Sequence, residues 1–180
     1  MVWRERYMIT KEFKNYFKPF IDELNKYADG VNKLNKGVNI NLIEKCENKL
    51  KIKLPETYKL FLNKYNGGEL FAVPVGITLT EIYIKEKGLK EKGGSYLDET
   101  FDEERRWPNL PKEYIIIDDT CEGDIICIDL KNSINPECKI VKLDTETGEV
   151  AETWNKLIDW LMYEMEFGSM LTNYDGTDKE

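Results

Sequence analysis

The spacing of hydrophobic residues predicts a helical stretch near the start of the chain. Between residues 10 and 27, phenylalanine and aliphatic side chains recur at every third or fourth position, which is the spacing of one helical face. Pro19 lies inside this stretch and predicts a kink or a break, because proline removes a helical hydrogen bond. The polar residues 28–36 that follow are expected to form a connector.

A helix–break–helix pattern occupies residues 43–68. Asn41 and Glu44 are the expected capping pair of the first helix, and Leu54 with Pro55 separates it from the second. The second helix presents an apolar face made of Tyr58, Phe61, Leu62 and Tyr65. Its expected end is a group of residues with backbone freedom, namely Asn66, Gly67 and Gly68.

A last helix is expected from Thr153, which can cap it, to Gly168, which can end it. Its apolar positions again follow helical spacing. Trp154 is expected in the core. Trp160 flanks that face and is expected to pack at the rim of the core or to make an exposed contact.

Between these helices the period changes to that of strands. Runs of strand length that are rich in Ile and Val occupy residues 69–77, 80–84, 114–117, 124–130 and 138–143. Helices, then meandering strands, then a helix predict an α+β fold with a mixed or antiparallel twisted sheet of about five or six strands, flanked by N-terminal helices and a C-terminal helix. The length favours one domain, residues 1–171, with the polar residues 172–180 as a flexible tail.

The composition narrows the function classes. The chain of 180 residues carries a formal charge of −8 and contains no histidine. Without histidine, Ser-His-Asp and Cys-His mechanisms and histidine-containing zinc sites are excluded. The acidic balance argues against direct binding of nucleic acid, because phosphate binding needs a basic surface, and it favours a basic protein partner.

Neither a disulfide framework nor a membrane segment is expected. The four cysteines form no Cys-x-x-Cys pair, and Cys46 and Cys127 fall at apolar positions, so buried free thiols are expected. No run approaches the ~18 apolar residues of a membrane span, and the first residues hold no apolar signal region. The sequence favours a cytoplasmic protein without cofactor or metal.

An acidic cluster is the first candidate site. Asp118, Asp119, Glu122 and Asp124 surround an expected turn between two strands. They favour a solvated hairpin tip whose carboxylates bond local N–H groups, a partner surface at Asp119 and Glu122, or cation and acid–base chemistry. Their order does not match an EF-hand loop.

The charged segment 85–107 is the second candidate site. Its first part is net positive, and its later part groups acidic residues with aromatic ones. Segregated charge beside aromatic residues is typical of an interface, although a solvated loop gives the same pattern. The partner-binding candidates here are Asp98, Glu99, Phe101, Asp102, Glu103, Glu104 and Trp107.

Several short motifs occur in a fixed order along the chain. They are Leu54, Pro55, Tyr58, Phe61, Asn66, Gly67, Gly68, Gly123 and Asp124, followed by a Trp-x-x-Leu-Ile helix. This ordered set resembles the SUKH superfamily, the cell-wall-assembly-regulator-like proteins that in bacteria mostly serve as immunity proteins against secreted toxins. The resemblance implies a SUKH-like core over residues 38–165, with residues 1–37 as an N-terminal helical extension.

The resemblance implies a binding protein rather than an enzyme. Such a protein would neutralise a polymorphic or contact-dependent toxin domain, commonly a basic nuclease whose substrate an acidic surface can mimic. One alternative is an intracellular scaffold or regulator of the cell-wall-assembly type. A carboxylate-dependent hydrolase that uses the 118–124 cluster is a third class. The sequence leaves open the toxin, the binding surface and the oligomeric state.

Overall fold

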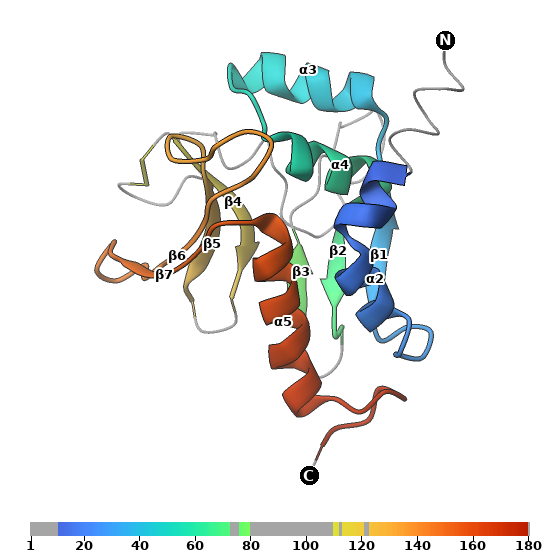
Figure 1. Cartoon of the computed structure of the whole chain (residues 1–180). Helices are drawn as coiled ribbons and strands as arrows, with labels where there is room; N and C mark the ends of the chain where they lie inside the picture. Colours follow the sequence, from blue (N-terminus) through green and yellow to red (C-terminus); the bar gives the residue numbers. More distant parts are fainter. Residues whose placement is uncertain (1–10, 73–75, 80–109, 112, 121–122, 180) are drawn as a thin grey trace, which may run out of the picture.

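The structure, a computed structural model, describes residues 11–72, 76–79, 110–111, 113–120 and 123–179 (Figure 1). Within them, seven strands form one sheet in the order β1-β2-β3-β4-β5-β6-β7, and every neighbouring pair is antiparallel. The strands are β1 (Lys33–Lys36), β2 (Tyr65–Leu70), β3 (Ile77–Leu79), β4 (Tyr114–Asp119), β5 (Ile125–Asp129), β6 (Ile140–Leu143) and β7 (Val150–Trp154). Each strand therefore pairs with its neighbours in sequence, as in a meander.

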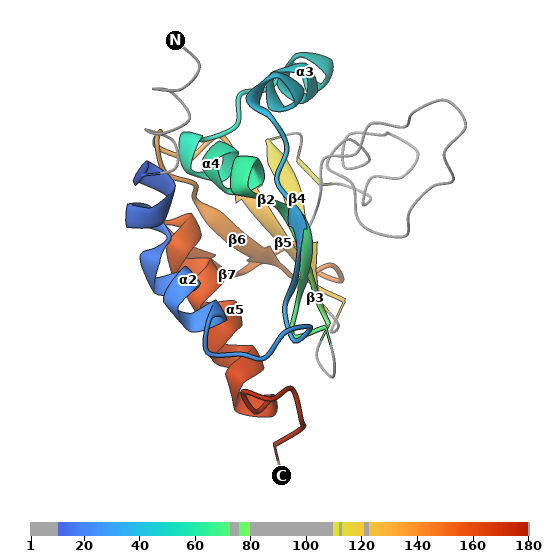
Figure 2. The same cartoon turned by 90° about the vertical axis from the view of Figure 1, so that its right-hand side faces the viewer.

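The helices gather on one face of this sheet. They are α2 (Lys18–Leu24), α3 (Ile40–Leu50), α4 (Glu56–Lys64) and α5 (Leu157–Leu171). Figure 2 shows α2, α4 and α5 on the same side of the strands, with α3 at one end beyond α4. This arrangement confirms the predicted α+β class, with helices from both ends of the chain flanking an antiparallel sheet.

The N-terminal helical stretch is broken where the sequence predicts it. Residues 11–16 are helical, Phe17 lies in a turn, and α2 begins at Lys18 with Pro19 in its first turn. A proline in the first turn loses no hydrogen bond, since the N–H groups there have no helical partner. Phe13, Phe17 and Phe20 are all buried, as their shared helical spacing predicts.

The junction between α3 and α4 depends on a buried carboxylate. Glu47, 2% exposed, accepts a hydrogen bond from the Leu54 N–H at 2.8 Å and one from Lys53 Nζ at 3.1 Å. These contacts fix the chain between the two helices. The cap of α3 is Asn39, whose side chain accepts from the Leu42 N–H at 2.9 Å. The predicted Asn41–Glu44 pair is wrong, because the helix begins at Ile40 and Asn41 already lies inside it.

The exit from α4 differs from the sequence prediction. The helix ends at Lys64, and Asn66, Gly67 and Gly68 are residues of β2 rather than a helix-closing turn. Their backbone freedom is used in the strand: Gly68 has φ 118°, and a Cβ there would lie 2.4 Å from the carbonyl oxygen of Lys33 on β1. Glycine therefore permits the close approach of these two strands.

The strand β1 was not expected, since the segment 28–36 reads as a connector. Its residues pair through the backbone with β2, with Lys33 opposite Glu69 and Leu34 opposite Gly68. Edge strands commonly carry charged residues, lysine above all, which discourage pairing with another chain, and β1 has Lys33 and Lys36. The polar sequence therefore does not reveal it.

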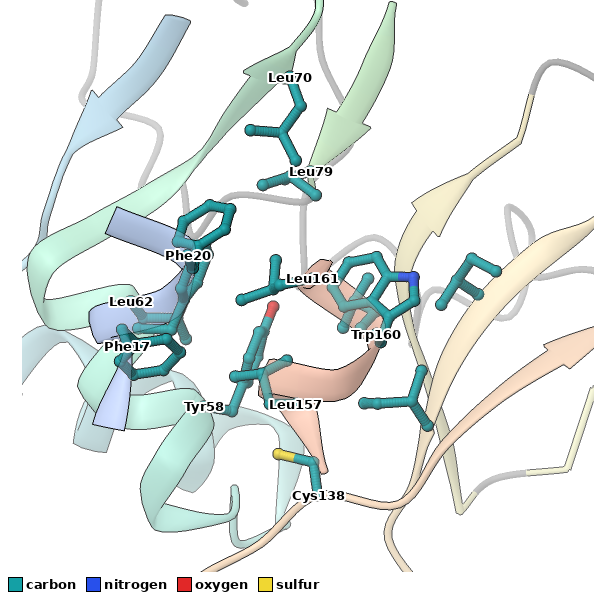
Figure 3. Packing of buried hydrophobic residues seen from close by; sticks show 14 of the residues in the cluster. Phe17, Phe20, Tyr58, Leu62, Leu70, Leu79, Cys138, Leu157, Trp160 and Leu161 are labelled. Atoms are coloured by element: carbon teal, nitrogen blue, oxygen red, sulfur yellow. The ribbon is translucent and has the colours of Figure 1, made fainter. Parts of the chain in front are cut away.

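The main core lies between the helices and the sheet. Side chains of β5 alternate across the sheet, so that Ile126 and Ile128 face the helices. In the close-up, Leu157, Trp160 and Leu161 of α5 lie in the centre of this core (Figure 3). The predicted burial of the α3–α4 region is confirmed for Leu54, Tyr58, Phe61 and Leu62.

A second, smaller hydrophobic cluster lies on the opposite face of the sheet. It comprises Ile116, Ile125, Cys127, Val141 and Leu143, with Leu110 and Tyr114 packed against it. Cys127 is fully buried there, and Cys46 is buried in the main core, as the sequence predicts.

The last helix begins and ends later than predicted. Thr153 and Trp154 belong to β7, and α5 starts at Leu157 after Lys156. Gly168 lies inside the helix and does not end it. A Cβ at Gly168 would lie 2.1 Å from the Phe71 ring, so the absence of a side chain lets α5 approach this ring.

The segment predicted as a tail turns back on itself in the structure. Thr172 bridges to Asp178, and the Asn173 N–H donates to the Thr177 carbonyl at 2.8 Å. The Ala28 N–H donates to the Tyr174 carbonyl at 2.7 Å, which ties this turn to the chain after α2.

Candidate protein-binding surfaces

The turn between β4 and β5 is held by local hydrogen bonds. The Thr120 N–H donates to the Asp124 carbonyl at 2.8 Å, and the Asp124 N–H donates to Thr120 Oγ1 at 3.1 Å. The turn between β6 and β7 also contributes, since Thr145 Oγ1 donates to the Gly123 carbonyl at 2.7 Å. The Thr120 hydroxyl therefore helps to hold this backbone.

The acidic residues of the predicted cluster lie in different environments. Asp124 forms an ion pair with Lys142 on β6, with 3.1 Å between Oδ2 and Nζ. Asp118 is buried, 2% exposed, so the solvated-tip interpretation is wrong for this residue. Asp119 pairs through its backbone with Ile125 at the end of β4. Glu122 lies outside the described residues. The ion pair between Asp124 and Lys142 therefore gives Asp124 a structural role.

All candidates of the charged segment lie outside the residues that the structure describes. They are Asp98, Glu99, Phe101, Asp102, Glu103, Glu104 and Trp107. In sequence, this segment lies between β3 and β4, which pair with each other through Leu79 and Asp118.

One acid of α5, Glu164, is buried. Burial raises the pKa of Glu164 to about 7, against a hydrogen bond of 2.8 Å from Trp160 Nε1 and the charge of Lys142, which both lower it. The charge of Glu152 raises it further. Among the residues that the structure describes, no group of three or more Cys, Asp or Glu side chains is placed to hold a metal ion. The hydrogen bond between Trp160 and Glu164 joins two residues of α5 that lie one helical turn apart.

The outer face of α5 is hydrophobic and uncovered. In the described part of the chain, eight large hydrophobic side chains are exposed, and five of them lie on α5 or directly after it: Tyr163, Phe167, Met170, Leu171 and Tyr174. A helix that is apolar on all sides is normally buried on all sides. Exposed hydrophobic patches of this kind mark surfaces that bind other proteins.

A shallow groove runs beside this outer face. It encloses about 580 Å³ between α5, the end of β7 and α2. Trp154 and Tyr163 line it, and their ring centroids are 5.1 Å apart at an interplanar angle of 54°. The carboxylates of Glu23, Asp159 and Glu166 also line it. The groove therefore combines an aromatic pair with acidic side chains.

Sequence reasoning missed this surface for a physical reason. The apolar residues of α5 follow helical spacing, and such residues are normally assigned to the core. The available signal was that Tyr163 and Met170 lie on the opposite side of the helix from Leu157, Leu161 and Met165, so that one sheet cannot cover them all. Trp154, expected in the core, instead lies partly exposed in the groove, and Trp160 is buried.

Among the helices that the structure describes, none has the length and the apolar character of a membrane span.

A solved structure is similar to this chain in fold, whereas no curated protein matches it. A crystal structure of a protein from Pseudomonas syringae pv. tomato matches with a TM-score of 0.54 at 17% identity, over 81% of this chain and 95% of that one, which supports the fold alone.

The sequence also matches the SMI1 / KNR4 family (SUKH-1) over residues 37–162. This range runs from before α3 into the first turns of α5 and contains every strand from β2 to β7, whereas α2 and β1 precede it. The match covers well over half of the chain and agrees with the core expected from the ordered motifs. The chain therefore belongs to the SMI1 / KNR4 (SUKH-1) family.

Proposed function

We propose that the protein is an immunity protein that binds a toxin domain and blocks it without catalysing a reaction. Membership of the SUKH-1 family supports a role as an immunity protein or a regulator, acting through protein partners. The observation that carries binding is the exposed hydrophobic outer face of α5, where Tyr163, Phe167 and Met170 lie uncovered. Such a face is stabilised when a partner removes it from water.

The charge of the chain supports a basic toxin domain as the partner. At a formal charge of −8, the protein attracts a basic surface over a distance and speeds its capture. The acidic segment from Asp98 to Glu104, and Asp119 with Glu122, remain proposed contributors to this attraction. Their anchors would be Phe101 and Trp107.

The test is to look in the neighbouring reading frame for a large secreted protein with a variable C-terminal domain, and to coexpress that domain with this chain. We expect the protein to restore growth and to copurify with that domain at a stoichiometric ratio. The association rate should fall steeply with added salt, because the screening length shrinks from about 10 Å at 0.1 M to about 3 Å at 1 M.

Two outcomes would contradict the proposal. Toxic domains that kill cells equally with and without the protein would exclude neutralisation of that toxin family. Restored growth without a physical complex would show that the protein acts indirectly, as a regulator.

Neutralising the five acids from Asp98 to Glu104 together should slow association, whereas Phe101→Ala or Trp107→Ala should mainly speed dissociation.

A further inference from the structure

We infer that the groove beside α5 is the docking surface for a basic, arginine-bearing segment of the partner protein. This inference rests on the proposed function and assigns it a surface. It concerns the described residues alone, namely Trp154 at the end of β7, Tyr163 and two carboxylates on α5, and Glu23 on α2.

The aromatic pair gives the groove a preference for cations. Trp154 and Tyr163 lie with their ring centroids 5.1 Å apart and tilted by 54°, and both line the groove. The faces of Trp and Tyr rings attract guanidinium and ammonium groups through their quadrupoles. Arginine suits such a site better than lysine, since its planar guanidinium stacks on a ring while its N–H groups remain free to donate.

The carboxylates lie where that guanidinium would donate. Asp159 and Glu166 flank Tyr163 on α5 at spacings of four and three residues, so all three side chains share one helical face. Both acids are exposed, and the structure gives neither an ion pair among the described residues. Glu23, on the other wall, is paired with Lys26 at 2.5 Å and is therefore the weaker acceptor.

Exposed hydrophobic residues follow the groove along α5, and they determine what the rest of the partner's segment must contain. Phe167 is 37% exposed and Met170 is 62% exposed, and they follow the groove along α5 toward its C-terminal end. A segment in which arginine alternates with aliphatic residues would cover these side chains while its cations meet the acids. The occupant is thus basic and amphipathic.

Charge argues against a second copy of this chain as the occupant. A symmetric dimer through this face would bring the acids of two grooves together, in a chain whose net charge is already −8. Like charges across an interface disfavour association. A basic partner removes the same hydrophobic face from water without this repulsion.

The first test is a titration of the full chain with the peptide acetyl-Arg-Leu-Arg-Arg-Leu-amide, followed through the indole N–H signals of labelled protein. We expect a saturable shift of the Trp154 signal and no saturable shift with the peptide in which citrulline replaces arginine. Asp159→Asn with Glu166→Gln should weaken binding about tenfold, and Tyr163→Ala about threefold.

A matched control separates local recognition from total charge. Glu146→Gln with Glu149→Gln removes the same charge at the exposed β6–β7 turn and should change binding by less than about twofold. Equal losses from both double variants, or no shift of the Trp154 signal, would overturn the inference. So would self-association of the parent chain that Tyr163→Ala abolishes, since it would identify a second copy as the occupant.

The copurified toxin domain distinguishes failure of the surface from failure of the function. If the toxin domain binds the parent and the Asp159→Asn/Glu166→Gln variant equally well, the function stands and the docking surface is wrong. If no toxin domain binds the parent, the proposed function fails, and the peptide titration alone decides the preference of the groove.

Discussion

The two faces of α5 are similar in sequence and opposite in environment. On the inner face, Leu157, Trp160 and Leu161 are at most 2% exposed and lie at the centre of the main core (Figure 3). On the outer face, Tyr163, Phe167 and Met170 are exposed. Because both faces are hydrophobic, the difference is set by where the sheet lies, and we expect stability to depend on one face and binding on the other.

The largest expected effect comes from truncating the inner face. Trp160→Ala should lower the free energy of unfolding by about 3–5 kcal/mol, the usual range for a buried aromatic residue, since it leaves a cavity and removes the indole N–H partner of Glu164. Urea denaturation measures this loss. A loss below ~1 kcal/mol would remove the contrast between the two faces.

The second effect is a dependence of stability on pH, which we expect from the buried Glu164 of the inner face and not from the exposed acids of the outer face. Burial raises the pKa of Glu164 to about 7, above the value of 4.5 expected in the unfolded chain. Between these values the folded state holds a proton that the unfolded state has lost, so stability falls as pH rises from about 5 to 8, by on the order of 2 kcal/mol.

Glu164→Gln should remove this part of the pH dependence, because the amide cannot ionise and can still accept from Trp160 Nε1. Denaturation at pH 5 and pH 8 gives the comparison. The exposed Glu166→Gln variant on the outer face is the matched control and should keep the parent profile. Identical profiles for Glu164→Gln and the parent would show that this carboxylate is solvated.

The third effect tests how closely the inner face approaches its neighbours. Gly168→Ala in a helix interior normally stabilises by up to about 1 kcal/mol. Here the added Cβ would lie 2.1 Å from the Phe71 ring, so we expect a loss of about 1–3 kcal/mol instead. In a double-mutant cycle, Phe71→Leu should relieve part of this loss. A gain in stability from Gly168→Ala would contradict the packing.

The smallest expected effect comes from the outer face. Met170→Ala should change the free energy of unfolding by no more than about 0.5 kcal/mol, since its side chain is 62% exposed, and Phe167→Ala, at 37% exposed, should cost about 1 kcal/mol, still far less than Trp160→Ala. The same variants should weaken capture of the toxin domain. A large loss of stability from either variant would show that this face belongs to the core.

Most of the fold follows from local patterns. The apolar face of α4 predicts the burial of Tyr58 and Phe61 because hydrophobic periodicity and burial share one cause. The junction of β7 and α5 does not follow, since Thr153 and Trp154 suit a strand as well as a helix start. Because α5 starts only at Leu157, Trp154 belongs to β7 and is partly exposed, whereas Trp160 lies in the first turn of the helix and is buried.

The candidate surface was harder to predict than the fold. Charge directs attention to acidic residues such as Asp119, but charge alone does not say which residues a partner contacts. Tyr163 and Met170 are hydrophobic at helical spacing and therefore resemble core residues in sequence. Only tertiary packing decides which side of α5 the sheet covers, and that information depends on strands far away in the sequence.

The packing of α5 against α2 also has a consequence for synthesis. Each strand of the meander pairs with the strand made just before it, but α5 contacts α2, β2 and β7 together. The part of the main core that α5 contributes, with Leu157, Trp160 and Leu161, is therefore missing from the nascent chain until α5 leaves the ribosome. We expect protease resistance to appear abruptly in stalled chains only once α5 has emerged, so protection would begin late in translation.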